Sequence, residues 1–309
     1  MNIVFMGTPS FAVPVLEALH AAGHRIVAVV TQPDKRNGRK GTMTPPPVKQ
    51  AAQALQLPVY QFEKIKSEQS AQALEDFAAD VIVTAAYGQI LSRRNLQAAP
   101  LGVINAHASL LPKYRGSAPV NWCLIHGETH TGVTTMHSDV GIDDGDMILQ
   151  QAIAIDPQDN AQTLLERLSH VAADLMCQTL TQIEAGTAPR IPQDPAQATY
   201  QPMLQKQDGQ LDFTHSMQAL CNRERGLTPW PGVFTSFAGE NWKFFALSPC
   251  QGHGAPGEVL CADPKTGLVI ACGDGAVQVG ELQAPGKKRM SADAFLRGKT
   301  IPLGARFGL

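Results

Sequence analysis

The sequence predicts two modules in series: an α/β module built on a Rossmann-like open, mostly parallel sheet, and then a small C-terminal β-barrel of the OB-like kind. The strand-like segments of the first half are apolar throughout rather than alternating, which is typical of parallel strands covered on both faces. After about Lys206, short β-rich segments separated by turns replace this pattern and indicate an all-β module. A chain of 309 residues has room for both modules.

In the first half, strand and helix signals alternate. The expected strands are residues 2–7, 24–31, 80–87 and 101–108. Phe11, Val15 and Leu19 share a four-residue spacing that predicts a helix after the first strand. Further helices are expected near residues 45–57, 67–79 and 160–185. This alternation is the pattern of βαβ units.

A proline-rich segment separates the two modules. Residues 189–206 contain four prolines, so we expect a semi-extended linker there rather than a helix or an inner strand. The expected domains are therefore residues 1–188 and 207–309, on either side of this linker.

Composition narrows the class of protein. The net charge is −2, so an anionic partner has to be met by local basic patches. The six cysteines form no CxxC pair, and we expect them to stay reduced, with no metal site. The start lacks a basic region before its apolar run, and no segment has membrane-spanning length. These features predict a cytoplasmic protein with no membrane partner, expected to be a monomer.

Two polar residues interrupt the fourth expected strand. Asn105 and His107 are two positions apart, so they project from the same side of the strand near its carboxyl end. Ligands of open parallel sheets bind outside that end. A hydrogen-bonded core pair is the alternative interpretation, but a turn containing Pro112 and Gly116 follows directly and favours a functional site. In the same turn, Arg115 offers a fork for an anion.

An acidic segment lies downstream, at residues 139–150. It contains four aspartates: Asp139, Asp143, Asp144 and Asp146. A calcium loop is one interpretation, although the glutamate that closes an EF-hand is absent. A solvated acidic turn is the second, and a carboxylate that reaches back to His107 is the third.

These motifs together resemble the folate-dependent formyltransferase family. The resemblance rests on INAHASLLPKYRG at 104–116 and VGIDDGD at 140–146, and it extends over nearly the whole chain. It includes MGTPSFAVPVLEAL, TQPDKRNGRKG and VTAAYGQIL in the first half, and GLTPWPGVFT and APGKKRMSADAFLRG in the second. Ala106 stands where a larger apolar residue is common in the family, and RERG before TPWPG is also slightly unusual.

The resemblance implies a formyltransferase fold and a set of site residues. It implies that Asn105, His107 and Asp143 are the catalytic residues and that 10-formyltetrahydrofolate is the formyl donor. Two segments are implied to bind the folate, the turn after the fourth strand and the loop after the third. Their residues are Ser109, Leu110, Leu111 and Pro112, and Ala86, Tyr87, Gly88, Gln89, Ile90 and Leu91.

The implied chemistry suits these residue types. An amine attacks the formyl carbon, and hydrogen-bond donors such as Asn105 and His107 stabilise the charge that builds on the oxygen. Asp143 orients the ring of His107 and is the candidate proton shuttle. The two substrates react directly with each other, so positioning supplies the rest of the catalysis.

Two basic segments indicate the acceptor. Residues 31–49 hold five cations and one anion, for a net charge of +4, and residues 287–309 hold six cations and one anion, for +5. The resemblance implies that the first segment contacts initiator methionyl-tRNA, and the basic edge of a β-barrel suits contact of the second with the phosphate backbone. The residues expected to do so are Lys35, Arg36, Arg39, Lys40, Lys287, Lys288 and Arg289. The plainer interpretations are a solvated loop and a module that only braces the catalytic domain.

Several alternatives stay open at this point. Related enzymes of the same fold formylate a nucleotide-sugar amine, and a folate-dependent hydrolase would share the trio. Glycinamide ribonucleotide formyltransferase resembles only the first domain. A dinucleotide-dependent oxidoreductase is disfavoured because GTPSF lacks G-x-G-x-x-G. An RNA-binding protein leaves Asn105 and His107 unexplained. A metal site drawn from His126, His130 and His137 is disfavoured because HGETH is not HExxH.

Overall fold

The computed structural model describes residues 1–37 and 41–308 and divides them into two compact units. Unit 1 comprises residues 1–119, 130–154 and 164–201, and unit 2 comprises residues 120–129, 155–163 and 202–309. Unit 2 thus includes two short segments that the sequence placed in the first domain. The expected domain limits at 188 and 206 stay a prediction.

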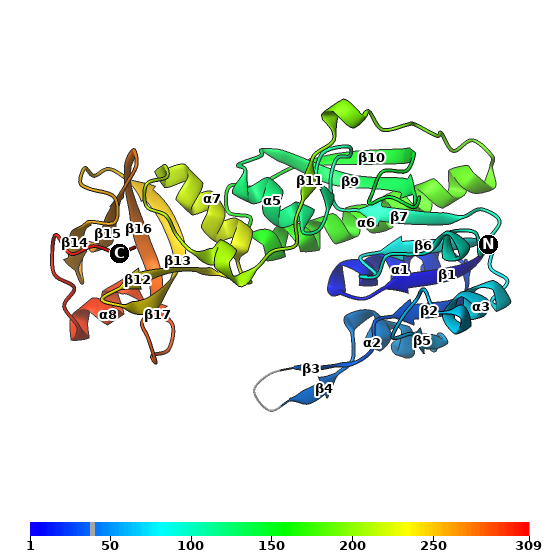
Figure 1. Cartoon of the computed structure of the whole chain (residues 1–309), viewed down its shortest axis with the longest axis horizontal. Helices are drawn as coiled ribbons and strands as arrows, with labels where there is room; N and C mark the ends of the chain where they lie inside the picture. Colours follow the sequence, from blue (N-terminus) through cyan, green and yellow to red (C-terminus); the bar gives the residue numbers. More distant parts are fainter. Residues whose placement is uncertain (38–40, 309) are drawn as a thin grey trace. The chain divides into compact units, whose positions relative to one another are not determined.

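Unit 1 is built on a seven-stranded sheet (Figure 1). Its strands are β1 (Asn2–Gly7), β2 (Arg25–Thr31), β5 (Val59–Gln61), β6 (Val81–Ala85), β7 (Val103–His107), β9 (His130–His137) and β10 (Met147–Ala154). The spatial order is β10-β9-β7-β6-β1-β2-β5, and the five strands from β7 to β5 are parallel. At one edge, β9 pairs antiparallel with both β7 and β10. The expected mostly parallel open sheet is therefore confirmed.

Helices cover both faces of this sheet. They are α1 (Val13–Ala21), α2 (Pro47–Ala54), α3 (Glu68–Asp76), α4 (Arg93–Leu96) and α6 (Ala161–Glu184). Leu74 of α3 packs against Val4 and Ile82 on one face, and Thr179 of α6 contacts Thr135 of β9. Residues of β6 are buried along its whole length, which explains why the sequence reads as apolar throughout.

The carboxyl ends of the parallel strands meet at one edge of the sheet. Gly7 pairs with Ala85, and Ala85 pairs with Ala106, so β1, β6 and β7 end side by side. The strand order reverses between β1 and β6, and just beyond their ends Thr8 Oγ1 donates to the Tyr87 carbonyl oxygen at 2.7 Å. Such a switch point is where open α/β sheets bind ligands.

The proline-rich segment lies on unit 1 as far as Gln201 and contains a 3-10 turn, η2 (Pro195–Gln197). Ile191 forms a β-bridge with Met147, and the short strand β11 (Tyr200–Gln201) pairs in parallel with β8 (Arg115–Gly116). We call residues 191–201 the strap, because they join the turn that follows β7 to the start of β10.

A two-stranded hairpin, β3 (Lys35–Asn37) and β4 (Thr42–Thr44), leaves the sheet after β2. Its base is held by an ion pair between Lys49 Nζ and Asp34 Oδ2 at 2.8 Å, and both groups also bond to the Gln61 side chain. Hydrogen bonds from Lys49 and Gln61 lower the pKa of Asp34. The hairpin therefore starts from a fixed base.

The C-terminal segment of unit 2 contains an antiparallel sheet and helices. The elements are α7 (Met217–Leu227), β12 (Val233–Phe237), β13 (Glu240–Cys250), β14 (Val259–Asp263), β15 (Gly267–Cys272), β16 (Gly275–Gln283), β17 (Met290–Ser291) and α8 (Ala292–Gly298). The strand order is β12-β13-β16-β15-β14, with β17 on β16. The expected all-β module is confirmed, although the strand pairs of the described residues do not close into a full barrel.

The core of unit 2 forms around one aromatic side chain. Phe307 is fully buried and stacks on Phe237 at 4.4 Å between ring centroids, with Trp242 and Phe244 edge-on to it. Helix α7 also packs closely on α5 (Pro119–Ile125), where Gly226 faces the Ile125 side chain. Among the described residues, no helix is both long and apolar enough to cross a membrane.

Candidate active site

Asn105 lies in β7, opposite Thr84 of the neighbouring strand β6. Its Oδ1 accepts a hydrogen bond from Thr84 Oγ1 at 2.8 Å, and Thr84 is its direct strand neighbour. This bond fixes the amide so that its NH2 group is the end left to donate. Asn105 is half-buried, so that donor can reach a bound molecule.

His107 is buried, and each of its two ring nitrogens faces an oxygen atom. Nε2 lies 2.8 Å from the carbonyl oxygen of Tyr114, which can only accept, so Nε2 carries a proton. Nδ1 lies 3.6 Å from Asp143 Oδ2, longer than a hydrogen bond but close enough for an ion pair when the ring is charged. In the neutral ring, Nδ1 is therefore an acceptor.

Asp143 is presented by a left-handed loop. Its φ is +51°, and its Oδ2 accepts a hydrogen bond from the backbone N–H of Gly116 at 2.9 Å. Gly116 itself has a φ of +90°, and a Cβ there would lie 2.7 Å from the Gln201 carbonyl oxygen. The structure thus brings Asp143 to His107, as the third interpretation of the acidic segment expected.

Side chains of β9 and β10 hold the turn 109–112 in place. Thr134 Oγ1 donates to the Ser109 carbonyl oxygen at 2.7 Å and accepts from the Leu111 N–H at 3.1 Å, while Gln150 Nε2 donates to the Leu111 carbonyl oxygen. The Ser109 hydroxyl donates to the Lys113 carbonyl oxygen. Leu110 and Pro112 are half-buried, whereas Ser109 and Leu111 are buried. Folate binding by this turn stays a prediction.

The second expected folate segment, 86–91, lies at the switch point of the sheet. Gln89 is tied to its neighbours by its Oε1, which accepts from the Ile65 N–H at 2.9 Å, and by its Nε2, which bonds to Gln32 and to the 62–63 backbone. Ala86, Gly88 and Ile90 are exposed and Leu91 is half-buried. Contacts of this loop with folate also stay a prediction.

Tyr87 is the buried residue of the loop 86–91, and its burial leads to a prediction about the stability of the protein. Its hydroxyl has no hydrogen-bond partner among the described residues, and burial raises its pKa to about 12. We expect Tyr87→Phe to raise the free energy of unfolding by about 1 kcal/mol at neutral pH, because an unsatisfied buried hydroxyl is removed. Burial raises the pKa of Tyr87 from its usual value of 10 to about 12, so the wild type keeps its stability below pH 10 and loses part of it as the pH rises to about 12.

Urea denaturation at pH 7 and between pH 10 and pH 12 measures both effects. The variant should lack the alkaline loss that the Tyr87 hydroxyl causes in the wild type. A clear drop in the stability of Tyr87→Phe at pH 7 would mean that the hydroxyl has a partner after all.

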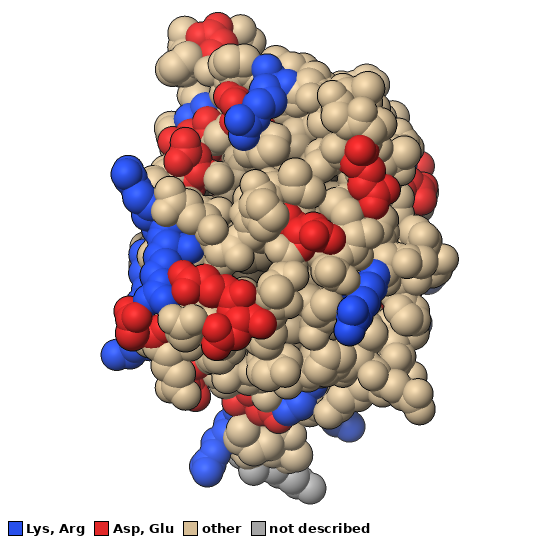
Figure 2. Space-filling model, turned by 90° about the vertical axis from the view of Figure 1, so that its right-hand side faces the viewer, with Lys and Arg blue, Asp and Glu red and all other residues tan. Residues whose placement is uncertain are grey.

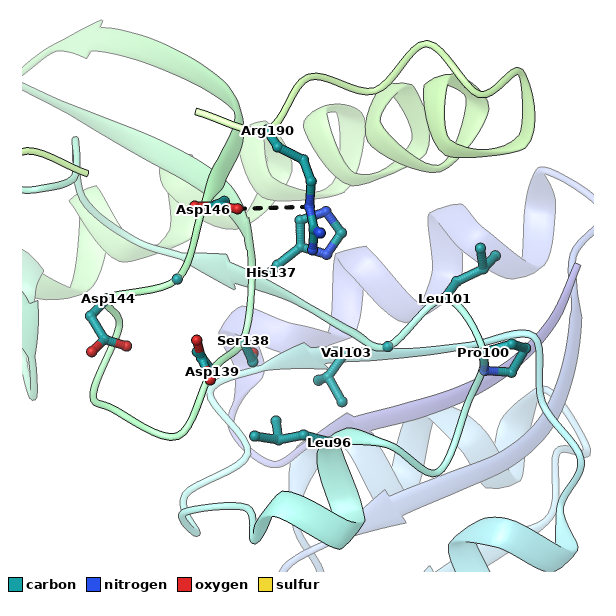
Figure 3. A pocket seen from close by; sticks show the side chains of 12 residues that line it. Leu96, Pro100, Leu101, Val103, His137, Ser138, Asp139, Asp144, Asp146 and Arg190 are labelled. Atoms are coloured by element: carbon teal, nitrogen blue, oxygen red, sulfur yellow. Dashed lines mark ion pairs between the residues drawn. The ribbon is translucent and has the colours of Figure 1, made fainter. Parts of the chain in front are cut away.

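A cavity of about 380 Å³ opens at the amino end of β7, the opposite end of this strand from His107 (Figure 3). Leu96, Leu101 and Val103 supply its apolar lining, and the acidic loop supplies Asp144 and Gly145. Figure 3 shows Asp146 paired with Arg190 across its upper side, at 3.7 Å.

His137 and Ser138 give the cavity neutral polar groups. Burial, reinforced by the charge of Arg190, lowers the pKa of His137, so this ring is neutral at pH 7. Sequence analysis named four of the lining residues, Asp139, Asp144, Asp146 and His137, but none of the apolar ones.

Arg115 does not offer a free fork for an anion, and this expectation was wrong. The side chain is 5% exposed, its Nε donates to Gln193 Oε1 at 2.9 Å, and a terminal nitrogen donates to the Tyr200 hydroxyl at 2.7 Å. Those donors are satisfied inside unit 1, because the strap covers this side of the turn.

The residues expected to bind tRNA are placed on two surfaces. Lys35 and Arg36 are exposed on β3, while Arg39 and Lys40 lie outside the described residues. Lys287 and Lys288 are exposed in the turn between β16 and β17.

Arg289 follows in that turn but has partners of its own: it pairs with Glu281, and its guanidinium lies 4.0 Å from the Phe245 ring centroid. Figure 2 shows one face of the protein, on which basic and acidic side chains lie next to one another. Contact with tRNA by these residues stays a prediction.

Among residues 1–37 and 41–308, no group of three or more His, Cys, Asp or Glu side chains is placed to hold a metal ion. The six cysteines, all within these ranges, are free thiols, and burial raises the pKa of Cys221 to about 11.

An amide donor, an imidazole and a carboxylate meet at the carboxyl edge of a parallel sheet, a set of groups that suits an enzyme of group transfer. Comparison with known proteins specifies which kind. The Formyl transferase family model matches residues 1–180, and the model described as Formyl transferase, C-terminal domain matches residues 203–300. The chain belongs to the formyl transferase family.

Its relatives are similar over their full length. A protein of Geobacter metallireducens named Methionyl-tRNA formyltransferase is 44% identical over 308 residues, covering 100% of this chain and 99% of the relative. A protein of the same name from Solibacter usitatus is 45% identical over 311 residues, with the same coverage of both chains.

Solved structures share the fold. HypX from Aquifex aeolicus, in complex with tetrahydrofolic acid, aligns with a TM-score of 0.66 at 15% identity, over 98% of this chain and 50% of that one. An N-formyltransferase from Helicobacter canadensis, in complex with folinic acid and dTDP-3-aminofucose, aligns with a TM-score of 0.65 at 16% identity, over 94% of this chain and 100% of that one.

Proposed function

We propose that this chain transfers the formyl group of 10-formyltetrahydrofolate to the amino group of initiator methionyl-tRNA, giving formylmethionyl-tRNA for translation initiation. The observation that carries the proposal is the Asn105–His107–Asp143 cluster in a chain 44% identical, over its full length, to a relative named Methionyl-tRNA formyltransferase. Such an enzyme works where translation occurs, in the cytoplasm, and we propose that it does so as a monomer.

Asn105 stabilises the charge that develops on the formyl oxygen. The amine nitrogen attacks the formyl carbon, a C–N bond forms, and the carbonyl electron pair moves onto oxygen. The NH2 group of Asn105 is already oriented by the bond between its Oδ1 and Thr84, so little reorganisation is needed when the charge appears. The electron pair then returns, and the bond between carbon and the folate nitrogen breaks.

His107 and Asp143 handle the protons. The attacking amine must be neutral, and the Nδ1 of neutral His107 can accept a proton because its Nε2 donates to the Tyr114 carbonyl. Asp143, 3.6 Å away, stabilises the charged ring that results. The proton then passes, directly or through water, to the departing folate nitrogen. No covalent bond to the protein is required.

The two segments expected to bind folate lie at the carboxyl edge of the sheet, where Asn105 and His107 also lie. Residues 86–91 follow β6, and residues 109–112 follow β7. A folate bound by both segments has its formyl group next to the carboxyl ends of these two strands. The cavity lined by Leu101, Gly102 and Val103 lies at the opposite edge, at the amino end of β7.

An assay with three acceptors tests the proposal. Purified protein receives 10-formyltetrahydrofolate with initiator methionyl-tRNA, with free methionine, or with no acceptor. Formylmethionyl-tRNA forming only in the first reaction is the expected result. Folate release in every reaction would instead indicate a hydrolase, and inactivity in all three would move the search to nucleotide-sugar amines.

A further inference from the structure

The strap touches both loops that form the candidate active site. β11 pairs with β8 at Gly116, the residue whose N–H bonds to the Asp143 carboxylate. Thr199 Oγ1 accepts from the Tyr114 N–H at 2.8 Å, and the Tyr114 carbonyl oxygen accepts from His107. Ile191 bridges to Met147, just after the acidic loop.

Gln193 is the one strap side chain that reaches the Asp143 loop itself in the part of the chain that the structure describes. Its Nε2 donates to the carbonyl oxygens of Asp143 at 2.9 Å and of Gly145 at 2.8 Å. The side chain belongs to a residue that is 8% exposed, so these bonds are shielded from water. Both N–H groups of the amide are used on the backbone that carries the catalytic carboxylate.

Arg115 fixes the other end of the same amide. Its Nε donates to Gln193 Oε1 at 2.9 Å, which settles the orientation of the amide and leaves its NH2 group facing the Asp143 loop. Arg115 is in turn held by the Tyr200 hydroxyl and lies over the Tyr200 ring, 5.5 Å from its centroid. A chain of bonds therefore runs from the strap to Asp143.

We infer that Gln193 is a positioning residue for catalysis: it holds the left-handed backbone of Asp143 so that the carboxylate stays on His107. The inference deepens the proposed function and rests on it. A loop with exposed Val140, Gly141 and Ile142 has few contacts of its own, so the carbonyl of Asp143 needs an external donor to keep one conformation. Gln193 supplies that donor from a buried position.

The test is Gln193→Glu, with Gln193→Met as a second variant of similar size. Glutamate keeps an acceptor for Arg115 but as a carboxylate cannot donate to the two carbonyl oxygens. We expect kcat for formylation to fall about tenfold in both variants, with the KM of each substrate changing less than about twofold, because a small displacement of a catalytic group slows the reaction.

A double-mutant cycle separates positioning from general damage. In an Asp143→Asn background, the same Gln193 change should lower kcat by less than about twofold, because residues that act through one another are non-additive. Gln197→Ala is the matched control: Gln197 is exposed on the same strap, its Nε2 bonds to Asp194, and its loss should leave kcat unchanged.

Amide hydrogen exchange of Gly116 gives a readout that does not depend on activity. Its N–H bonds to Asp143 Oδ2, so it should exchange faster in Gln193→Glu and not in Gln197→Ala. A kcat within twofold of wild type, an equal fall in both backgrounds, or unchanged exchange would each overturn the inference. If the wild type formylates no tRNA, the proposed function fails, and the exchange of Gly116 still decides whether Gln193 positions Asp143.

Discussion

Replacing Asn105 by alanine should lower kcat by about a hundredfold to a thousandfold, the usual loss when one oxyanion donor is removed. The effect should be on kcat rather than on KM, because the NH2 group of Asn105 gains most of its value when charge develops on oxygen. Thr84 would lose its partner but retain a position on the strand, so the fold should persist. Single-turnover formylation at saturating folate and tRNA measures the change.

Asp143→Asn is the companion to this variant. Asparagine can still accept from the Gly116 N–H, so the loop should keep its shape while the negative charge next to His107 is lost. We expect kcat to fall about a hundredfold to ten-thousandfold, the range that general acid–base catalysis contributes. The double variant should lose much less than the product of the two single losses, since residues of one catalytic unit are not additive.

The matched control for these changes is Asn241→Ala, because Asn241 is exposed on β13 in unit 2. Its kcat should equal that of the wild type. Near-normal turnover by Asn105→Ala would remove the proposed oxyanion role, and near-normal turnover by Asp143→Asn would remove the proposed role in proton transfer.

Part of this site can be predicted from the sequence alone. The side chains of a strand alternate, so Asn105 and His107 must project together, and the apolar strands place them at the carboxyl edge of a parallel sheet. Asp143 is different, because its position depends on a left-handed loop that no periodicity specifies. The resemblance to a family named it, and three interpretations of the acidic segment were open without that resemblance.

The supporting contacts could not be predicted in the same way. Gln193 is 50 residues from Asp143 in the sequence, and its amide finds the loop only because the strap folds back over it. Arg115 shows the opposite error: next to a turn it looked like an anion ligand, yet burial makes it a partner of Gln193 and Tyr200. Such long-range pairings carry no local signal in a single sequence.

The same distinction holds for the fold. The long helix expected at 160–185 is observed at Ala161–Glu184, because its apolar stripe is continuous over many turns. The hairpin β3–β4 was missed, since its strands have three residues each and are largely polar. Helix α7 was missed within the β-rich region because Gly226, which helix propensity disfavours, is required there by close packing on α5.

Reversing the charge of the β3 cations should be the strongest test of the tRNA surface. We expect the double change Lys35→Glu and Arg36→Glu to raise the KM for initiator methionyl-tRNA about tenfold to a hundredfold, because lysine and arginine contacts to phosphate dominate nucleic-acid affinity. Both residues are exposed on a hairpin whose base is fixed by Lys49 and Asp34, so the change should leave the fold and the KM for folate unaltered.

The salt dependence shows whether these residues contact phosphate. For two lost contacts, the slope of log KM against log salt concentration should fall by roughly 1.4 to 1.8, from about 0.7 to 0.9 per phosphate. Lys64→Glu with Lys66→Glu is the matched control, because these two lysines are exposed in unit 1 and their reversal changes the net charge equally. If both pairs raise KM to the same extent, the hairpin has no special part in binding tRNA, whereas an effect confined to Lys35 and Arg36 places the tRNA on it.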